Sequence, residues 1–212
     1  PWGEDDPTEQ KANFGNLIGD TTEVGIYKEG ASAFGVLDLA GNVWEWTSSL
    51  HFDYPFDSND GRESVTTWGA RVVRGGNYLH SGKNIRCADR HSIFPTARDI
   101  YIGFRVVVDD LAKVNNKCEV DFEWKKIPAG QFLMGSEFTP IPGDAPDPEY
   151  FGVSKHGANR PADFDNEIPQ HKILLEKYQI SKTPVTNAQY EIFTKATGYP
   201  VPGHWPEGVV TP

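Results

Sequence analysis

The chain has few of the features that build covalent or membrane-spanning scaffolds. Two cysteines, Cys87 and Cys118, are too few for a disulfide framework. The apolar runs are far shorter than the roughly 20 residues that a membrane helix needs, and no signal peptide is visible. Twenty Lys and Arg face 30 Asp and Glu, and the resulting net charge of −10 argues against nucleic acid as a partner. We therefore expect a soluble protein that binds neither membrane nor nucleic acid.

Aromatic residues and residues that favour turns are plentiful instead. Six tryptophans, 21 glycines and 16 prolines predict a fold rich in irregular loops packed around aromatic side chains. Short strand-like runs occur at residues 102–108, 122–127 and 131–134, and residues 171–180 read as a strand pair or a bent strand. A capping box at residues 186–189 opens a helix that Gly198 ends. The class is therefore α+β, in a length that suits one large domain or two small ones.

Residues 41–46 are the stretch around which the chain is organised. In an extended strand, Trp44 and Trp46 face one way, and Val43 and Glu45 face the other. A carboxylate turned toward the protein body needs a cation or hydrogen-bond donors. Asp38 and the Gly-Asn turn before the strand add oxygen atoms of the kind that calcium selects. The residues alone leave two alternatives open, a cation site and an arginine pair.

A second group of polar side chains lies near the N-terminus. Asn13 and Asn16 are three residues apart around a glycine. Asparagine commonly stabilises turns in such a setting. The same side-chain oxygens could also ligate a second cation, so both interpretations stand at this point.

Residues 77–101 show no clear periodicity, although they lie between two strand-like runs. Irregular stretches of such length are usually functional or disordered. The aromatic residues here, together with Arg86, Arg90 and Arg98, argue against disorder. We interpret the stretch as an exposed binding surface that arginine interactions hold in place.

Five motifs together resemble a known family. They are IPAGQFLMGS at 127–136, PVTNAQY at 184–190, LAGNVWEW at 39–46, RGG at 74–76 and GFR at 103–105. These motifs are similar to those of the formylglycine-generating enzyme, or sulfatase-modifying factor, family. The resemblance implies an α+β C-type-lectin-like fold, with a small twisted antiparallel sheet, few helices and much ordered loop.

The order of the segments differs from that of the family. Residues 1–108 resemble the family's C-terminal part and residues 119–212 its N-terminal part, joined by residues 109–118, while a central family segment is absent. A circular permutant, parts of two tandem domains and separate pieces numbered together all give this order. We favour one domain over residues 1–212, in which residues 103–108 and 122–127 pair as a hairpin. The missing segment would leave a gap that an intermolecular partner could fill.

The resemblance also implies two calcium sites. The first uses the side chains of Asn13 and Asn16 and the carbonyl groups of Phe14 and Ile18. The second uses the side chains of Asp38 and Glu45 and the carbonyl groups of Gly41 and Val43. Calcium is thus the expected cofactor, bound by oxygen atoms alone at roughly 2.3–2.6 Å.

The family's catalytic residues are not matched. Its enzymes oxidise cysteine with copper held by two cysteines shortly after the Gly-Gly motif. Here one position falls at or near His80 and the other within residues 82–85, which contain no cysteine. We therefore expect a binding protein and no catalytic residues. The alternative is a formylglycine-generating-type oxidoreductase, or an enzyme similar to the related sulfoxide synthases.

Residues 77–101 also resemble the variable region of lectin-fold proteins that retroelements diversify. There, constant motifs alternate with positions that vary from asparagine codons. The resemblance implies recognition of an unknown protein or small-molecule ligand. The expected ligand-binding residues are Tyr78, Leu79, His80, Asp89, His91, Ile93, Phe94, Asp99 and Tyr101.

Overall fold

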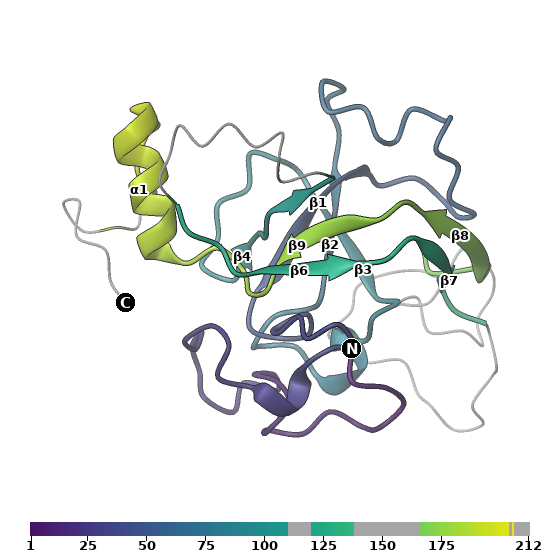
Figure 1. Ribbon diagram of the computed structural model, residues 1–212, viewed down its shortest axis with the longest axis horizontal. Coiled ribbons are helices and arrows are strands. Elements are labelled where there is room, and N and C mark those ends of the chain that lie inside the picture. Colours follow the sequence, from purple (N-terminus) through teal and green to yellow (C-terminus); the bar gives the residue numbers. More distant parts are fainter. Residues whose placement is uncertain (110–119, 138–165, 204, 206–212) are drawn as a thin grey trace.

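The computed structural model describes residues 1–109, 120–137, 166–203 and 205 of the chain. Within them, short strands form three small sheets, which long ordered loops connect (Figure 1). The largest sheet has the order β3-β2-β1-β4. Its strands are β1 (Trp44–Leu50), β2 (Arg71–Arg74), β3 (Arg90–Ile93) and β4 (Ile102–Gly103). β2 runs antiparallel to β1 and β3, whereas β4 runs parallel to β1.

In the middle of this sheet, the register separates charged from aromatic side chains. Glu45 lies opposite Arg74, and Arg74 lies opposite Arg90. One position further along, Trp46 lies opposite Val73, and Val73 lies opposite His91. Successive side chains of a strand point to opposite faces, so these two rows lie on different faces of the sheet. Trp44 shares the face of Trp46, which agrees with the predicted alternation in β1.

The second sheet joins strands from distant parts of the chain. It has the order β5-β9-β6, with β5 (Val107–Val108), β9 (Tyr178–Ser181) and β6 (Trp124–Ile127). The predicted hairpin of residues 103–108 with 122–127 is therefore wrong, because β9 lies between them and pairs with both. A central β9 satisfies backbone groups on both of its edges, which a two-stranded hairpin would not. The predicted single strand over 102–108 is also divided, since β4 and β5 belong to different sheets.

The third sheet is a two-stranded ribbon of β7 (Gly130–Met134) and β8 (His171–Leu175). The helix α1 (Asn187–Thr197) lies at the other end of the molecule from this ribbon (Figure 1). Its N-cap Thr186 and Gln189 form the predicted capping box, and Gly198 ends it in a left-handed conformation. Short 3-10 helices, η1 (Lys28–Gly30) and η2 (Gly82–Ile85), lie in the loops. None of the helices described here has the length and apolar character needed to cross a membrane.

Strands from both parts of the chain meet in the second sheet. β5 precedes residues 110–119, which lie outside the described residues, and β6 and β9 follow them. The permuted segment order and the gap between the chain ends stay predictions, because Pro212 also lies outside the described residues.

Candidate functional site

The carboxylate of Glu45 is held by an arginine. Both of its oxygen atoms accept hydrogen bonds from the guanidinium group of Arg105. Arg105 also donates to the carbonyl groups of Leu37 and Asp38, at 3.1 Å each. The guanidinium group thus supplies the positive charge that a metal would bring to these oxygens. Of the two alternatives for Glu45, this geometry fits the arginine pair better than calcium.

Asp38 is partly satisfied in the same region. Its Oδ2 atom accepts a hydrogen bond of 2.6 Å from the amide of Gly25, whereas its buried Oδ1 atom has no hydrogen-bond partner among the described residues. Burial raises the pKa of this carboxyl group, and the Gly25 hydrogen bond and Arg105 act in the opposite direction. The second predicted calcium site therefore has one oxygen atom available in Asp38, but not the carboxylate of Glu45.

The first predicted calcium site fits a hard cation better. Asn13 is only 2% exposed, and its amide nitrogen donates to the carbonyl of Asp20 at 2.9 Å and to Asn42 Oδ1 at 3.2 Å. Its Oδ1 atom is buried and has no hydrogen-bond partner among the described residues. Asn16 adopts a left-handed conformation with φ 57°, which asparagine tolerates better than most residues. An orphaned buried oxygen is the kind of atom that a calcium ion would satisfy.

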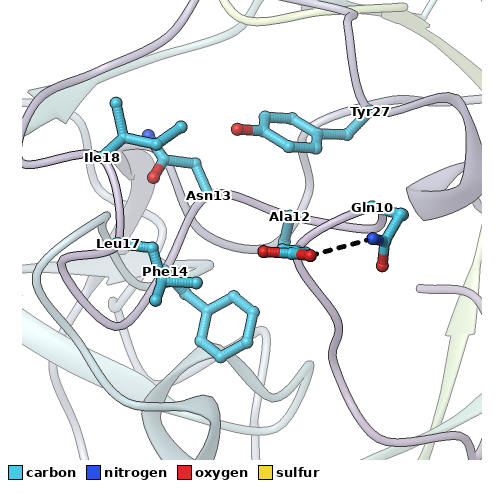
Figure 2. A pocket seen from close by; sticks show the side chains of 8 residues that line it. Gln10, Ala12, Asn13, Phe14, Leu17, Ile18 and Tyr27 are labelled. Carbon is cyan, nitrogen blue, oxygen red and sulfur yellow. Dashed lines mark hydrogen bonds between the residues drawn. The ribbon is translucent and has the colours of Figure 1, made fainter.

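A pocket of ≈ 320 Å³ lies beside this loop. Figure 2 shows the side chains that line it: Glu9, Gln10, Ala12, Asn13, Phe14, Leu17, Ile18 and Tyr27. The carboxylate of Glu9 accepts a hydrogen bond of 3.2 Å from Gln10 and adds negative charge to the pocket. No group of three or more His, Cys, Asp or Glu side chains with the arrangement of a metal site occurs among the described residues. The loop would therefore rely on amide and carbonyl oxygens.

The predicted recognition residues divide into buried and exposed groups. Tyr78 and Asp89 are buried, so the expectation that Asp89 is exposed is wrong. Asp89 immediately precedes β3, where the chain enters the packed sheet, and a polar residue can be buried there when neighbouring groups satisfy it. His80, Ile93 and Tyr101 are half-buried. The exposed members are Leu79, His91, Phe94 and Asp99.

Two histidines of this group contact the buried ring of Trp44. The His80 ring meets it edge-on, with centroids 5.3 Å apart, and the His91 ring stacks on it at 5.9 Å. Loss of solvent around the packed imidazoles lowers the pKa of both histidines, and His91 adds repulsion that lowers the pKa of His80 further. Both rings are therefore neutral at pH 7 and present uncharged imidazole beside the aromatic floor.

A second aromatic contact extends this surface. Phe94 is 54% exposed and stacks on Trp68, which is 67% exposed, with ring centroids 6.2 Å apart. Trp68 was not among the predicted recognition residues, because it lies outside the irregular stretch 77–101. The signal that could have identified Trp68 is the presence of a tryptophan in the otherwise polar loop between β1 and β2. A hydrogen bond to Asp99 raises the pKa of Tyr101, which lies on the same stretch.

Arginines hold the loops that carry these side chains, as predicted. Arg74 donates to the carbonyl groups of Ala88 and Asp89 at 2.7 and 3.0 Å, and to the hydroxyl of Tyr54 at 2.6 Å. Arg86 donates to both oxygen atoms of Glu167, at 3.1 and 2.6 Å. These hydrogen bonds confirm the structural role that we expected of Arg86 and give Arg74 the same role.

Arg90 also belongs to this framework, although we expected only a general role for it. Its guanidinium group lies 3.9 Å from the centre of the Tyr54 ring and donates to the carbonyl of Phe52 at 2.8 Å. Burial lowers its pKa to about 10, so it stays charged at pH 7. On the face of the sheet opposite Trp44 and His91, the half-buried Arg74 and the buried Arg90 thus form an arginine layer that holds the neighbouring loops.

Comparison with known proteins identifies the family. The model of the "Sulfatase-modifying factor enzyme 1-like domain" family matches residues 1–110 and 117–211. The chain belongs to this family. Its fold is accordingly α+β and C-type-lectin-like, with small sheets, one helix in the described residues and long ordered loops.

Several curated relatives match about half of the chain. A hercynine oxygenase of Mycolicibacterium smegmatis is 34% identical over 51% of this chain and 27% of its own length. A serine/threonine-protein kinase Pkn1 of Chlamydia trachomatis is 36% identical over 51% of this chain and 18% of its own length. A formylglycine-generating enzyme of Streptomyces coelicolor is 34% identical over 35% of this chain and 17% of its own length. The chain spans about a quarter or less of the length of these relatives.

A solved structure is also similar in part. Treponema denticola variable protein 1 is 29% identical and matches 48% of this chain and 40% of its own chain, with a TM-score of 0.33.

The positions at which the family resemblance leads us to expect the copper-binding cysteines carry other residues. The His80 ring packs on Trp44, and its Nδ1 atom accepts a hydrogen bond of 3.4 Å from the amide of Asn77. Residues 82–85 form the 3-10 helix η2. Cys87 is exposed, and Cys118 lies outside the described residues. The soft thiolate pair that selects Cu(I) is therefore not supplied by these positions.

Proposed function

We propose that this chain is a non-catalytic ligand-binding module of the sulfatase-modifying factor family. Its recognition surface consists of the exposed parts of Leu79, His91, Phe94, Asp99 and Tyr101, with Trp68 beside them. The observation that carries the proposal is the contrast between the two faces of the main sheet. One face holds Trp44 with the exposed His91 ring stacked on it, and the other holds the half-buried Arg74 and the buried Arg90, whose hydrogen bonds fix the adjoining loops.

The relatives support a module that is not tied to one activity. Proteins named as oxygenases, kinases and formylglycine-generating enzymes match within 35–51% of this chain, and the matched part is a minor part of each relative. A segment shared by proteins with such different names is better explained by a common fold than by a common reaction.

The finer proposal is that a retroelement diversifies the recognition surface. Fifteen positions between the constant motifs carry residues that can each arise by changing the first two bases of an asparagine codon: residues 78–81, 84, 89, 91–94, 96, 97 and 99–101. The encoding gene's neighbourhood tests this proposal. A reverse transcriptase gene beside a near-copy of this coding segment is the expected arrangement, and a lone gene would contradict it.

Calcium is the proposed cofactor, held by the loop of residues 13–18. The orphaned Oδ1 atom of Asn13 supports this site. The side chain of Asn16 and the carbonyl groups of Phe14 and Ile18 complete the proposed oxygen set. A cation there would neutralise part of the negative charge near Glu9 and fix the loop, without any role in bond making.

A metal-dependent oxidoreductase is the second candidate, because relatives named hercynine oxygenase are 34–35% identical to half of this chain. Two assays separate the candidates. We expect the purified chain to take up neither copper(I) nor iron(II) stoichiometrically, and to leave a cysteine-containing peptide unoxidised. Stoichiometric uptake of either metal, together with peptide oxidation, would favour the enzyme.

The binding function itself is testable without knowledge of the natural ligand. We would select a random peptide library, displayed on phage, against the purified chain. Hydrogen-exchange footprinting of a selected peptide is expected to protect residues 79, 91–94 and 99–101. A footprint confined to the β7–β8 ribbon or to α1 would overturn the proposed surface.

A further inference from the structure

The loop of residues 13–18 is hydrogen-bonded directly to residues 78 and 80 of the recognition stretch 77–101. The amide of Gly15 donates to the carbonyl of His80, and the amide of Asn16 donates to the carbonyl of Tyr78, both at 2.7 Å. Tyr78 precedes the exposed Leu79, and His80 follows it. The backbone around Leu79 is thus held by the same loop that carries the orphaned oxygen of Asn13.

A third connection runs through Asn42. Its amide donates to the carbonyl of Asn13 at 2.8 Å, and its own carbonyl accepts from the amide of Tyr78 at 3.1 Å. Its side-chain oxygen accepts from the amide nitrogen of Asn13 at 3.2 Å. Asn42 therefore connects Asn13 to Tyr78 by hydrogen bonds, near the start of the recognition stretch 77–101.

Apolar packing follows the same route. Phe14 packs against a buried cluster that includes Ala12 and Ile85. Ile85 belongs to η2, which directly follows residues 78–81 of the recognition stretch. Both ends of residues 78–85 therefore rest on the loop of residues 13–18, by hydrogen bonds at one end and by packing at the other.

The structure leaves one strong acceptor of this loop unused. Asn13 Oδ1 is buried and has no hydrogen-bond partner in the part of the chain that the structure describes, although the nitrogen of the same amide makes two hydrogen bonds that fix its direction. The oxygen lies on a side chain that lines the pocket of Figure 2. Leaving a buried acceptor unsatisfied is unfavourable. A bound cation would remove this cost and favour the loop conformation that makes the bonds to Tyr78 and His80.

We propose that cation binding by the loop of residues 13–18 orders residues 78–80 and so controls the shape of the recognition surface. The inference rests on the proposed binding function and on the calcium site described there. The new point is that the cation affects recognition through Gly15 and Asn16. Both residues belong to the cation-binding loop, and their amides donate hydrogen bonds to the carbonyl groups of His80 and Tyr78. The His80 ring, which packs on Trp44, would move with its backbone.

Hydrogen exchange with and without calcium tests the coupling. Calcium affinity is first measured by calorimetry, and exchange is then followed at the amides of Gly15, Asn16, Tyr78 and His80. If residues 78–80 open only after the cation leaves, exchange slows by the factor 1 + [Ca²⁺]/Kd, which is about 100-fold at a calcium concentration of 100 times Kd. Magnesium, which prefers more rigid octahedral sites, serves as the comparison ion.

Three variants test whether calcium binding at this loop causes the protection of residues 78–80. Asn16→Gly keeps the left-handed backbone but removes the side-chain oxygen, so it should weaken calcium binding and abolish the calcium-dependent protection of residues 78–80. Asn16→Asp adds a carboxylate and should tighten calcium binding. Asn59→Gly, in the exposed loop between β1 and β2, is the control and should behave as the wild type.

The outcomes are distinct. Calcium binding with slowed exchange at Tyr78 and His80 supports the proposal. Calcium binding with unchanged exchange at these amides overturns the coupling and leaves the calcium site intact. No calcium binding at about 1 mM overturns both, while the peptide-binding test of the recognition surface remains independent.

Discussion

At the scale of single residues, hydrogen bonds between Glu45 and Arg105 join β1 to the segment between β4 and β5. Glu45 was expected to hold either a cation or an arginine, and Arg105, 60 residues further along, reaches both of its oxygen atoms. The alternation in β1 predicted which way Glu45 points. It could not identify the partner, because the approach of Arg105 depends on the break between β4 and β5. Asp89 was mispredicted for a similar reason, since its burial depends on the packing of β3.

Three histidines make the stability of the fold depend on pH. Burial, with Arg90 and His91 nearby, lowers the pKa of His51 to about 4, although Asp53 acts in the opposite direction. The pKa values of His80 and His91 are lowered as well. The unfolded chain therefore binds more protons than the folded chain between pH 6.5 and about 4, and stability falls as the pH falls through this range.

The variant His51→Gln isolates one part of this effect. It keeps a polar side chain that cannot be protonated, so the free energy of unfolding should decrease less between pH 6.5 and pH 4, by roughly 1–3 kcal/mol. Urea unfolding at a series of pH values measures it. An unchanged pH dependence would show that His51 is not a buried neutral histidine in the native state.

At the scale of elements, local signals predicted the helix well and the sheets only in part. The capping box of α1 is a local pattern, and the structure reproduces it. The split of residues 102–108 into β4 and β5 has no local signal. It follows from competition between two sheets, with β1 pairing with the first piece and β9 with the second. The central place of β9 likewise depends on residues about 70 positions away from β5.

The cap of α1 can be tested directly. The hydroxyl of Thr186 accepts a hydrogen bond of 3.2 Å from the amide of Gln189. Thr186→Ala should lower the free energy of unfolding by about 1 kcal/mol, because one amide of the first turn loses its partner. Thr197→Ala, in the last turn of the same helix, should have a smaller effect. Equal losses for the two variants in thermal unfolding would contradict a specific role for the cap.

At the scale of the whole molecule, ion pairs connect parts of the chain that are far apart in sequence. Glu167 is 0% exposed, and Arg86 and the hydroxyl of Ser136 bind its carboxylate. This arrangement ties the loop before β3 to the segment that follows β7 and to the segment that precedes β8. The family resemblance predicted the motifs that come together, but the sequence offered no means of pairing these two charges.

Removal of Arg86 should therefore destabilise the whole fold. Arg86→Ala leaves a buried carboxylate without its cation, which typically costs about 3–5 kcal/mol. The exposed pair of Lys195 and Glu191 gives the control, since Lys195→Ala should cost less than about 1 kcal/mol. Urea unfolding of both variants measures the difference. A loss below about 1 kcal/mol for Arg86→Ala would mean that Glu167 finds another partner or takes up a proton.

The central claim is that the exposed side chains of residues 77–101 recognise a ligand while the arginine layer only supports them. Phe94 and Phe34 are similarly exposed, at 54% and 49%, but only Phe94 lies on the proposed surface. The most direct measurement compares the affinity of a peptide selected on the wild type for Phe94→Ser and Phe34→Ser. We predict that Phe94→Ser lowers the affinity for the peptide about tenfold or more, which equals about 1.4 kcal/mol, while its thermal stability stays that of the wild type. Phe34→Ser should keep the wild-type affinity. Equal affinities for the two variants, or unfolding of Phe94→Ser, would contradict the account.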